Sequence, residues 1–514
     1  FVWCIMKVVH FLFPVGLVLL YFLCRYSGES ETENWNGIDV FGVRKVEWPA
    51  CGDGEHRSVC DQREKVFLQV ITEEREPVII TNCEALEAKK LSTWNVEWIS
   101  EHIHSLHQVR VQRAKKGFLY YNKERGLENI QLYGQFPNGS VPTIPLRPEF
   151  MEKSYSIGQF FSDMNEENKK PAKDKNFMYF SGHASYLGSQ MYSRIEKETS
   201  NFVVESSQAY EIASELNENL TTEDFTGKHV NLWIGNMGVT AIAHYDTSHN
   251  FFFQMYGNKE FVLFPPEQHW NVYLHSFFHP YYRRTQVDIE DIQGCIDRAP
   301  LLERLEGKIA RLEAGDLLYL PPYWFHHVES GSNITVSMNV WSNSQEYWAN
   351  EALFAAPIPF ESDWDVPHTL CIAIEYVEYL LNRLELNLDD TMTHNTLNST
   401  SRFPLSASFF RLLFHSRFEN TFGSIPEAHE ILKYYGDCIL QCMTKEISKE
   451  SRQSTLERFQ RGHASVSRFF DLLPSQGVKT INFTNYVESL LVMIVGPEHL
   501  HPVVQSLALH LLES

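Results

Sequence analysis

Short apolar segments separated by turn residues fill the stretch from Phe177 to Trp341, and no other feature constrains the fold as strongly. The segments read NFMYF, VNLWIG, TAIAHYD, FFFQMYG, KEFVLFPP, DLLYLPP and ITVSMNVW. Many short strands separated by turn residues are typical of a β-sandwich or a β-barrel. We therefore predict a mainly β core over residues 177–345.

The pattern of apolar residues is different on both sides of this core. After Trp341, several segments place apolar residues at helical spacing, which predicts an α-helical C-terminal region over residues 346–514. Residues 29–176 combine a helix-like start, a buried strand VIIT and a second short strand at Val109–Gln112, and they predict a flanking region of α/β elements. A chain of 514 residues with 43% hydrophobic content can bury a large core, but it is too long for one ordinary domain.

The first residues carry an apolar run from Val8 to Cys24, preceded by Met6-Lys7. Its length lies at the border between the apolar region of a signal peptide and a membrane-spanning helix. We expect residues 1–28 to form a secretory signal peptide or a signal anchor, and thus a possible membrane anchor. A buried N-terminal helix is the alternative.

The cysteines and the N-glycosylation sequons are relevant to the cellular compartment in which we expect the chain. Cys51 and Cys60 bracket a polar, Gly-containing segment, which predicts a disulfide-closed loop. Cys438 and Cys442 are four residues apart in a helical pattern, which favours packing over a disulfide between them. Sequons permit glycosylation at Asn138, Asn219, Asn333, Asn398 and Asn482. We expect the endoplasmic reticulum lumen or another part of the secretory pathway, with the cytoplasm as the alternative.

The net charge of the chain is -21 at pH 7. An acidic surface disfavours contact with phosphate backbones, so we expect no nucleic acid among the direct partners. Basic partner segments stay possible, although the simplest interpretation of the charge is a well-solvated surface.

Three chargeable side chains in the β core predict a metal site. His244 and Asp246 lie two residues apart in a strand, so both project from the same face. A third ligand is expected from the PPYWFHH segment, as His326 or His327. Two imidazoles and one carboxylate are the facial triad of non-haem Fe(II) oxygenases, and they leave positions open for a chelating 2-oxo acid and for O2. Lys259, in the next strand, would pair with the distal carboxylate of such an acid, because a buried lysine is costly unless paired.

The segments HYD…N…K, GDLLYLPPYWFHHVES and ITVSMNVW, within residues 177–345, resemble the JmjC/cupin-type 2-oxoglutarate oxygenases. They are most similar to the small hydroxylases of that group, among them the asparaginyl hydroxylase that inhibits hypoxia-inducible factor. The resemblance implies a double-stranded β-helix, or jelly roll, that holds the metal in its mouth. It implies iron ligation by His244, Asp246 and His326, and 2-oxoglutarate binding by Lys259, Tyr179, Asn250 and Asn339.

One position departs from the pattern of the family. A threonine that bonds to 2-oxoglutarate often lies three residues before the first histidine, and here that position is Ala241. Strand alternation would point the neighbouring Thr240 away unless a bulge intervenes. The loss of one hydrogen bond, worth on the order of 1 kcal/mol, would weaken cosubstrate binding without abolishing it.

The resemblance implies an Fe(II)- and 2-oxoglutarate-dependent dioxygenase that consumes O2 and releases succinate and CO2, with ascorbate as a possible reductant. Its substrate would be a protein or peptide side chain that becomes hydroxylated. A JmjC lysine demethylase ranks lower, since the sequence shows no histone-reading module or basic segment and the leader argues against a nuclear setting. A catalytically silent cupin-fold interaction module is the alternative from another class.

The helical C-terminal region raises the possibility of a homodimer. The segment ASFFRLLFHSRF carries more apolar surface than one helix face needs, and related hydroxylases pair through C-terminal helices. The alternative is that these helices pack against the rest of their own chain.

Overall fold

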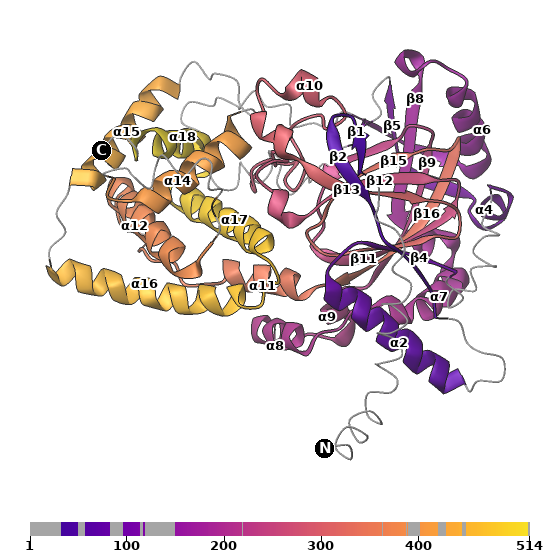
Figure 1. Cartoon of the computed structure of the whole chain (residues 1–514), viewed down its shortest axis with the longest axis horizontal. Helices are drawn as coiled ribbons and strands as arrows, with labels where there is room; N and C mark the ends of the chain where they lie inside the picture. The colour runs from indigo at the N-terminus through magenta and orange to yellow at the C-terminus, as the bar shows by residue number, and fades with distance from the viewer. Residues whose placement is uncertain are drawn as a thin grey trace.

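The computed structural model describes residues 32–49, 57–82, 96–113, 117–118, 150–386 except 218 and 362, 388, 401–419, 428–444 and 449–511. A β-rich half is built from the N-terminal and central parts of the chain, and a helical half is built from the C-terminal part (Figure 1). The predicted mainly β core with an α-helical C-terminal region is thus confirmed.

Two β-sheets face each other in the core. The first has the order β1 (Thr32–Trp35), β2 (Ile38–Gly42), β13 (Glu306–Leu312), β12 (Lys259–Phe264), β15 (Phe325–Ser330), β10 (Thr240–His244), β6 (Gly117–Phe118). The second has the order β3 (Lys45–Glu47), β4 (Val78–Thr81), β14 (Leu317–Leu320), β11 (Ser248–Tyr256), β16 (Ile334–Asn343), β9 (His229–Asn236), β8 (Asn176–His183), β5 (Ser105–Arg113), β7 (Met151–Ser156). Side chains of both sheets form one apolar cluster, with Phe261 and Val328 from the first and Phe252 and Leu318 from the second.

All seven apolar segments predicted as strands form strands, and so do VIIT and the Val109–Gln112 segment. β13, with the sequence EGKIARL, was missed because charged residues interrupt its apolar pattern. The sheets also take in β1 to β7 from the part of the chain before residue 177. The β core therefore depends on pairing between segments that are distant in sequence.

Helices cover the outer face of the second sheet. These are α2 (Arg57–Glu74), α4 (Val96–His102), α6 (Ile157–Asn168) and α7 (Ser189–Glu198). Phe67, Ile99 and Phe160 from these helices join strand residues such as Val230 and Phe251 in one buried cluster. The free energy gained from this apolar contact, about 25 cal/mol per Å² of buried surface, holds the helices on the sheet.

The C-terminal helices pack together beside the first sheet (Figure 1). They are α11 (Gln345–Phe354), α12 (Val366–Leu384), α14 (Pro404–Leu413) with a π-helical turn η9 (Phe414–Phe418), α15 (Ala428–Thr444), α16 (Lys449–Phe470), α17 (Gln476–Val495) and α18 (Leu500–His510). Shorter helices lie at α8 (Ser207–Leu216), α9 (Thr222–Thr226) and α10 (Ile292–Cys295). Phe325 of β15 and Tyr245, which directly follows β10, belong to the same buried cluster as Phe409 and Phe483 of the helices.

The segment that suggested a homodimer is buried within its own chain. Phe409, Phe410, Leu412 and Leu413 are each 0% exposed, and Phe418 is 1% exposed. The apolar surplus of this segment is therefore explained by packing inside the helical region. A homodimer stays a hypothesis, without this observation to support it.

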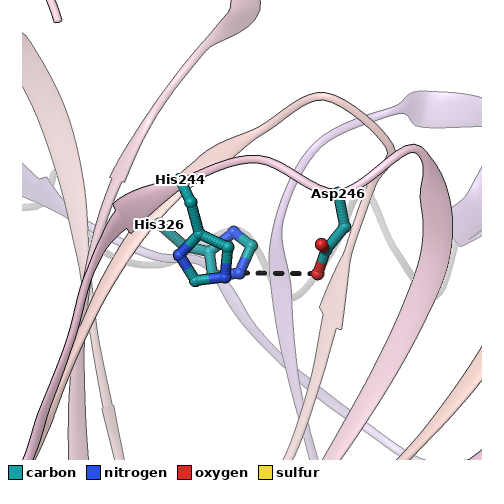
Figure 2. Close-up of side chains that lie close together, drawn as sticks. All are labelled: His244, Asp246 and His326. Carbon is teal, nitrogen blue, oxygen red and sulfur yellow. Dashed lines mark ion pairs between the residues drawn. The ribbon is translucent and has the colours of Figure 1, made fainter. Parts of the chain in front are cut away.

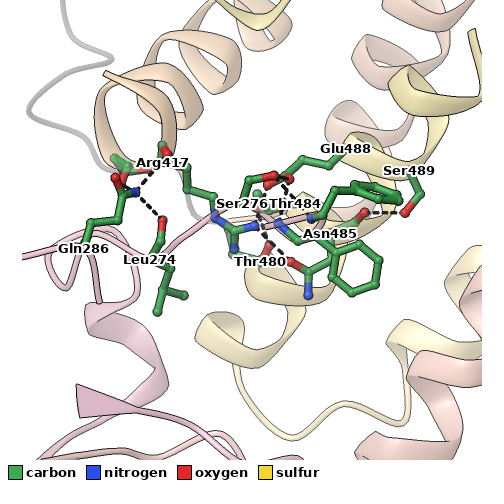
Figure 3. Close-up of polar contacts among 12 residues, drawn as sticks. Leu274, Ser276, Gln286, Arg417, Thr480, Thr484, Asn485, Glu488 and Ser489 are labelled. Carbon is green, nitrogen blue, oxygen red and sulfur yellow. Dashed lines mark hydrogen bonds and ion pairs between the residues drawn. The ribbon is translucent and has the colours of Figure 1, made fainter. Parts of the chain in front are cut away.

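A buried ion pair joins the helical region to the segment between β12 and β13 (Figure 3). Arg417 Nη1 donates to Glu488 Oε1 at 2.6 Å and to Asn485 Oδ1 at 2.9 Å. Glu488 Oε2 in turn accepts from the backbone N–H of Phe277 at 2.8 Å and from the Ser276 hydroxyl. The two charged side chains are 3% and 0% exposed, so this pair is shielded from water.

A disulfide between Cys371 and Cys442 links α12 to α15. The expectation that Cys442 is a packing residue is therefore wrong, because its partner lies 71 residues earlier and no local spacing signals it. Cys438 is a free, buried cysteine, as expected. Cys60 is also disulfide-bonded, and its expected partner Cys51 lies outside the described residues. Disulfides persist mainly in oxidising compartments, and this adds one observation to the secretory-pathway hypothesis, which stays a prediction.

In the part of the chain that the structure describes, no helix has the length and apolar character needed to cross a bilayer. The leader expected at residues 1–28 falls outside that part, as do the sequons at Asn138 and Asn398. Asn482 is fully buried in α17, where its amide donates to Val478 O at 2.8 Å. Its sequon therefore cannot carry a glycan in the folded chain.

The buried ion pair predicts a large effect on stability. Glu488→Ala leaves Arg417 buried without its carboxylate, and we expect the free energy of unfolding to fall by about 3–5 kcal/mol. Urea denaturation measures this loss. Lys169→Ala is the control, because it removes an exposed pair with Glu166 and should cost only about 0–1 kcal/mol. Similar losses for both variants would contradict the structural role of the buried pair.

Candidate metal centre

A β-bulge places the first histidine. β10 pairs antiparallel with β15, with Ala241 opposite Val328 and His244 opposite His326. Three steps along β10 therefore match two steps along β15, so β10 contains one extra residue between these positions. A bulge of this kind re-aims side chains, and here it sets Ala241 and His244 on the same face.

The side chains of His244, Asp246 and His326 converge (Figure 2). One ligand atom from each lies within 4.8 Å of the others. His326 Nε2 is 3.8 Å from Asp246 Oδ2, and the two imidazole centroids are 4.1 Å apart. Ligand atoms lie about 2 Å from a bound divalent transition metal. The three side chains would therefore have to approach one another only slightly to bind one ion. Two imidazoles and one carboxylate are also a chemically suitable donor set for Fe(II).

Backbone carbonyls orient both imidazoles. His244 Nδ1 lies 2.7 Å from Ile242 O, and His326 Nδ1 lies 3.0 Å from Trp324 O. A carbonyl can only accept, so each Nδ1 carries the proton and each Nε2 keeps a lone pair for a metal.

The surroundings favour the neutral form of both rings. Burial lowers the pKa of His244 well below its ordinary value, and the neighbouring His326 adds to this effect. Burial also lowers the pKa of His326, although Asp246 opposes the shift. Both imidazoles are therefore in the form that binds metals at neutral pH.

The structure distinguishes the two adjacent histidines. His326 lies in the cluster, whereas His327 points to the other face of β15, where its Nε2 is 2.8 Å from Glu290 Oε1. His327 also makes an edge contact with Trp35, at a centroid distance of 5.7 Å. Trp324 and Val328 lie in the interior cluster between the sheets, as alternation along β15 predicts.

A cavity of about 810 Å³ opens beside the cluster. This is large enough for a small-molecule ligand together with part of a second reactant. Its wall is formed by strands β5, β8, β9 and β10, by the segment 277–284, and by helices α11 and α17. The lining includes Arg110, Tyr179, Trp233, Ala241, His244, Asp246, Arg283, Tyr323, Tyr347 and Asn485.

Lys259 and Tyr179, predicted to bind the cosubstrate, lie close to each other. Lys259 is 4% exposed, and its Nζ lies 5.9 Å from the ring centroid of Tyr179 and 5.2 Å from that of Phe252. Among the described residues it has no hydrogen-bond or ion-pair partner. Burial lowers the pKa of Lys259 to about 7, because no neighbouring anion stabilises its charge. Lys259 is not among the cavity-lining residues that the structure describes, so its role at the cosubstrate stays a prediction.

Asn250 and Asn339 also lie next to each other, and their side chains form hydrogen bonds with protein groups. Asn339 Nδ2 donates to Asn250 Oδ1 at 3.0 Å, and Asn339 Oδ1 accepts from Trp233 Nε1 at 2.8 Å. Neither asparagine is among the cavity-lining residues that the structure describes, whereas Trp233 is. Their role at the cosubstrate stays a prediction.

Ala241 lines the cavity, and the neighbouring Thr240 does not replace the missing hydroxyl. Thr240 Oγ1 donates to Gly238 O at 3.2 Å, away from the cluster. The bulge lies on the C-terminal side of Ala241, and it turns Ala241 rather than Thr240 toward His244.

Sequence reasoning missed several residues of the cavity wall. Arg283 has a left-handed backbone (φ 67°), and its charge acts on Asp246. Asn485 reaches the cavity from α17, far along the chain. The YYRR segment that holds Arg283 lies in a long connection without periodic pattern, so only its charge could have drawn notice.

Comparison with known proteins gives a family model and several relatives. The model described as Cupin-like domain matches residues 63–346. HSPB1-associated protein 1 of Bos taurus is 33% identical over 122 residues, which are 23% of this chain and 25% of that protein. JmjC domain-containing protein D of Dictyostelium discoideum is 34% identical over 101 residues, 20% of this chain and 22% of that protein. Lysine-specific demethylase JMJ30 of Arabidopsis thaliana is 32% identical over 128 residues, 24% of this chain and 26% of that protein. The chain thus spans about a quarter of the length of these curated relatives.

The two adjacent histidines allow a matched test of the metal centre. We expect His326→Gln to weaken Mn(II) binding by more than the roughly 10–100-fold that loss of an outer partner costs. His327→Gln should keep the affinity of the unaltered chain, because His327 faces Glu290 and not the cluster. Mn(II) titration followed by electron paramagnetic resonance measures both. Equal affinities of the two variants would contradict the assignment of the third ligand.

Proposed function

This chain belongs to the cupin-like domain family, and we propose that it is an Fe(II)- and 2-oxoglutarate-dependent dioxygenase that hydroxylates a protein or peptide side chain. Succinate and CO2 would be the other products. The observation that carries the proposal is the cluster of His244, Asp246 and His326 in the wall of a large cavity.

His244, Asp246 and His326 would hold the iron, which with 2-oxoglutarate and O2 supplies the oxidising chemistry. The two neutral imidazoles offer Nε2 lone pairs, and the carboxylate offsets part of the metal charge. Asp246 is held in place through its backbone, whose carbonyl accepts from Tyr323 N at 2.7 Å. Tyr245 stacks on Tyr323 at a centroid distance of 5.1 Å, and this aromatic pair limits water access on that side.

Lys259 and Tyr179 would bind the carboxylate at the far end of 2-oxoglutarate. The support is a buried ammonium group with no anionic partner among the described residues, beside a tyrosine that lines the cavity. Burying a cation is unfavourable unless an anion joins it, so part of the binding free energy would come from relief of this cost.

Lysine demethylation is the second candidate, because one relative is named Lysine-specific demethylase JMJ30. The same oxidation on an N-methyl group would give formaldehyde instead of a stable hydroxylated residue. A silent interaction module is the third, and it is favoured by Ala241, which removes one possible contact with the cosubstrate.

Succinate release tests the proposed chemistry. The purified chain with Fe(II), ascorbate and 2-oxoglutarate should release succinate, and Asp246→Ala should release less than a tenth as much, since it lacks a metal ligand. Mass spectrometry of succinate measures both, and an assay for formaldehyde with methylated peptides distinguishes demethylation. Equal succinate from the two proteins would contradict the proposal. Absence of both succinate release and 2-oxoglutarate binding at millimolar concentration would favour the silent module.

The lowered pKa of Lys259 predicts a pH-dependent affinity for 2-oxoglutarate. Below pH 7 the ammonium group is already charged, so the affinity should be constant. Above about pH 7 the free lysine loses its proton and binding must restore it, so the affinity should fall by up to about tenfold per pH unit. Calorimetry of the Mn(II)-loaded chain at pH 6.5 and 8.5 measures this, together with proton uptake. Lys259→Met should bind weakly with no such slope, and a flat profile for the unaltered chain would contradict the role of Lys259.

A further inference from the structure

We propose that Asn482 of α17 is a positioning residue of the candidate metal centre, and that it acts on Asp246 through the hydroxyl and the backbone of Tyr323. The inference rests on the proposed function, because it concerns the site that would hold the iron. It goes beyond that function, since the metal affinity of the β core would then depend on the C-terminal helical region.

The turn before β15 has an uncommon backbone conformation at Tyr323. Its backbone is left-handed, with φ 67°, although its side chain is large and only 1% exposed. This conformation is unfavourable for a bulky residue and persists only where the surrounding structure enforces it, often at functional sites. In this conformation the Tyr323 N–H donates to the Asp246 carbonyl at 2.7 Å. The strained turn therefore holds the main chain at one of the three candidate ligands.

A hydrogen bond from the helical region fixes the side chain of Tyr323. The Tyr323 hydroxyl donates to Asn482 Oδ1 at 3.0 Å, and Asn482 Nδ2 donates to Val478 O at 2.8 Å. Because the carbonyl of Val478 can only accept, the orientation of the amide is determined and its oxygen faces the tyrosine. Both side chains are at most 1% exposed, so the loss of either partner would leave a buried polar group without this hydrogen bond.

The ring of Tyr323 also contacts the neighbours of the other candidate ligands. Tyr245, the middle residue of the HYD segment, stacks on Tyr323 at a centroid distance of 5.1 Å and an interplanar angle of 18°. Tyr245 also makes an edge contact at 5.5 Å with Phe325, which directly precedes His326. A shift of the Tyr323 ring would therefore displace residues that adjoin all three candidate ligands.

Buried polar contacts hold α17 in place for this role (Figure 3). Three residues after Asn482, Asn485 Oδ1 accepts from Arg417 Nη1 at 2.9 Å. Burial raises the pKa of Tyr245, and a hydrogen bond from Asn485 opposes this rise. Glu488, three residues further along the helix, accepts from Arg417 at 2.6 Å. One helix therefore contacts both tyrosines of the stacked pair, and a buried ion pair fixes that helix.

A simpler interpretation is that the contact between Asn482 and Tyr323 only stabilises the fold. A bond of that kind would change the free energy of unfolding and leave the metal affinity of the folded chain as it is. A positioning bond changes the affinity itself, because the ligands of the folded chain are then held less well. The two interpretations therefore differ in a binding measurement that needs no substrate.

The full chain is titrated with Mn(II), followed by electron paramagnetic resonance, at a temperature where circular dichroism shows every variant to be folded. The proteins are the unaltered chain, Tyr323→Phe, Asn482→Leu, the double variant and Thr484→Val. Thr484 is the matched control, since it is fully buried in the same helix and its hydroxyl donates to Thr480 O at 2.7 Å, within α17.

We expect Tyr323→Phe and Asn482→Leu each to raise the Kd for Mn(II) about tenfold, at the lower end of what the loss of an outer partner costs. The double variant should match the single ones, because both changes remove the same hydrogen bond. Thr484→Val should destabilise the fold and leave the Kd unchanged. The spectrum of bound Mn(II) should change its line shape in Tyr323→Phe, since the ligand geometry changes, but not in Thr484→Val.

Three results would overturn the inference while the proposed function stands. Tyr323→Phe could bind Mn(II) with the Kd of the unaltered chain, Thr484→Val could weaken binding as much as Tyr323→Phe does, or the double variant could show the product of the two single losses. If the unaltered chain does not bind Mn(II), the proposed function fails as well. Should Asn482→Leu prove insoluble, Tyr323→Phe and Thr484→Val decide by the same comparison.

Discussion

The pairing of β10 with β15, with its one extra residue on β10, is the constraint on which the rest of the structure depends. It sets His244 opposite His326, while alternation sends Tyr245 and Phe325 to the other side of the sheet. One face of these strands therefore carries the candidate metal ligands His244 and His326. The other face carries the aromatic residues that join the core shared with the C-terminal helices. The register that aligns the two histidines is thus the same register that anchors the helical half.

The helical region contributes residues to the cavity wall and is connected to the β core around it. Tyr323, which holds the backbone of Asp246, donates its hydroxyl to Asn482 of α17 at 3.0 Å. Asn485 of the same helix lines the cavity and accepts from Arg417, which is paired with Glu488. The start of α17 lies so close to the β half that a Cβ at Gly477 would be 2.3 Å from the carbonyl carbon of Pro266. Only glycine allows this approach, so the position of α17 relative to the candidate metal centre is fixed by backbone contact.

Strand periodicity and the HYD segment made most of the β core predictable from sequence, and the three candidate ligands with it. Alternation along β15 also favours His326 over His327, because the inward face then holds Trp324 and Val328. Features that depend on distant pairing could not be foreseen. The Cys371–Cys442 bridge spans 71 residues, and the bulge in β10 shows only when Ala241 is seen to pair with Val328 and His244 with His326. The apolar segment at residues 407–418 left two alternatives open, since a sequence does not reveal whether surplus apolar surface meets its own chain or a second copy.

The cavity wall draws on residues from Gln108 to Asn485, whereas the three relatives named above match over 122, 101 and 128 residues. No stretch of that length can contain both ends of the wall. The residues that shape the rest of the cavity can therefore differ between this chain and those relatives, so that one fold can admit different ligands. What such a relative acts on is then no guide to the ligand of this cavity.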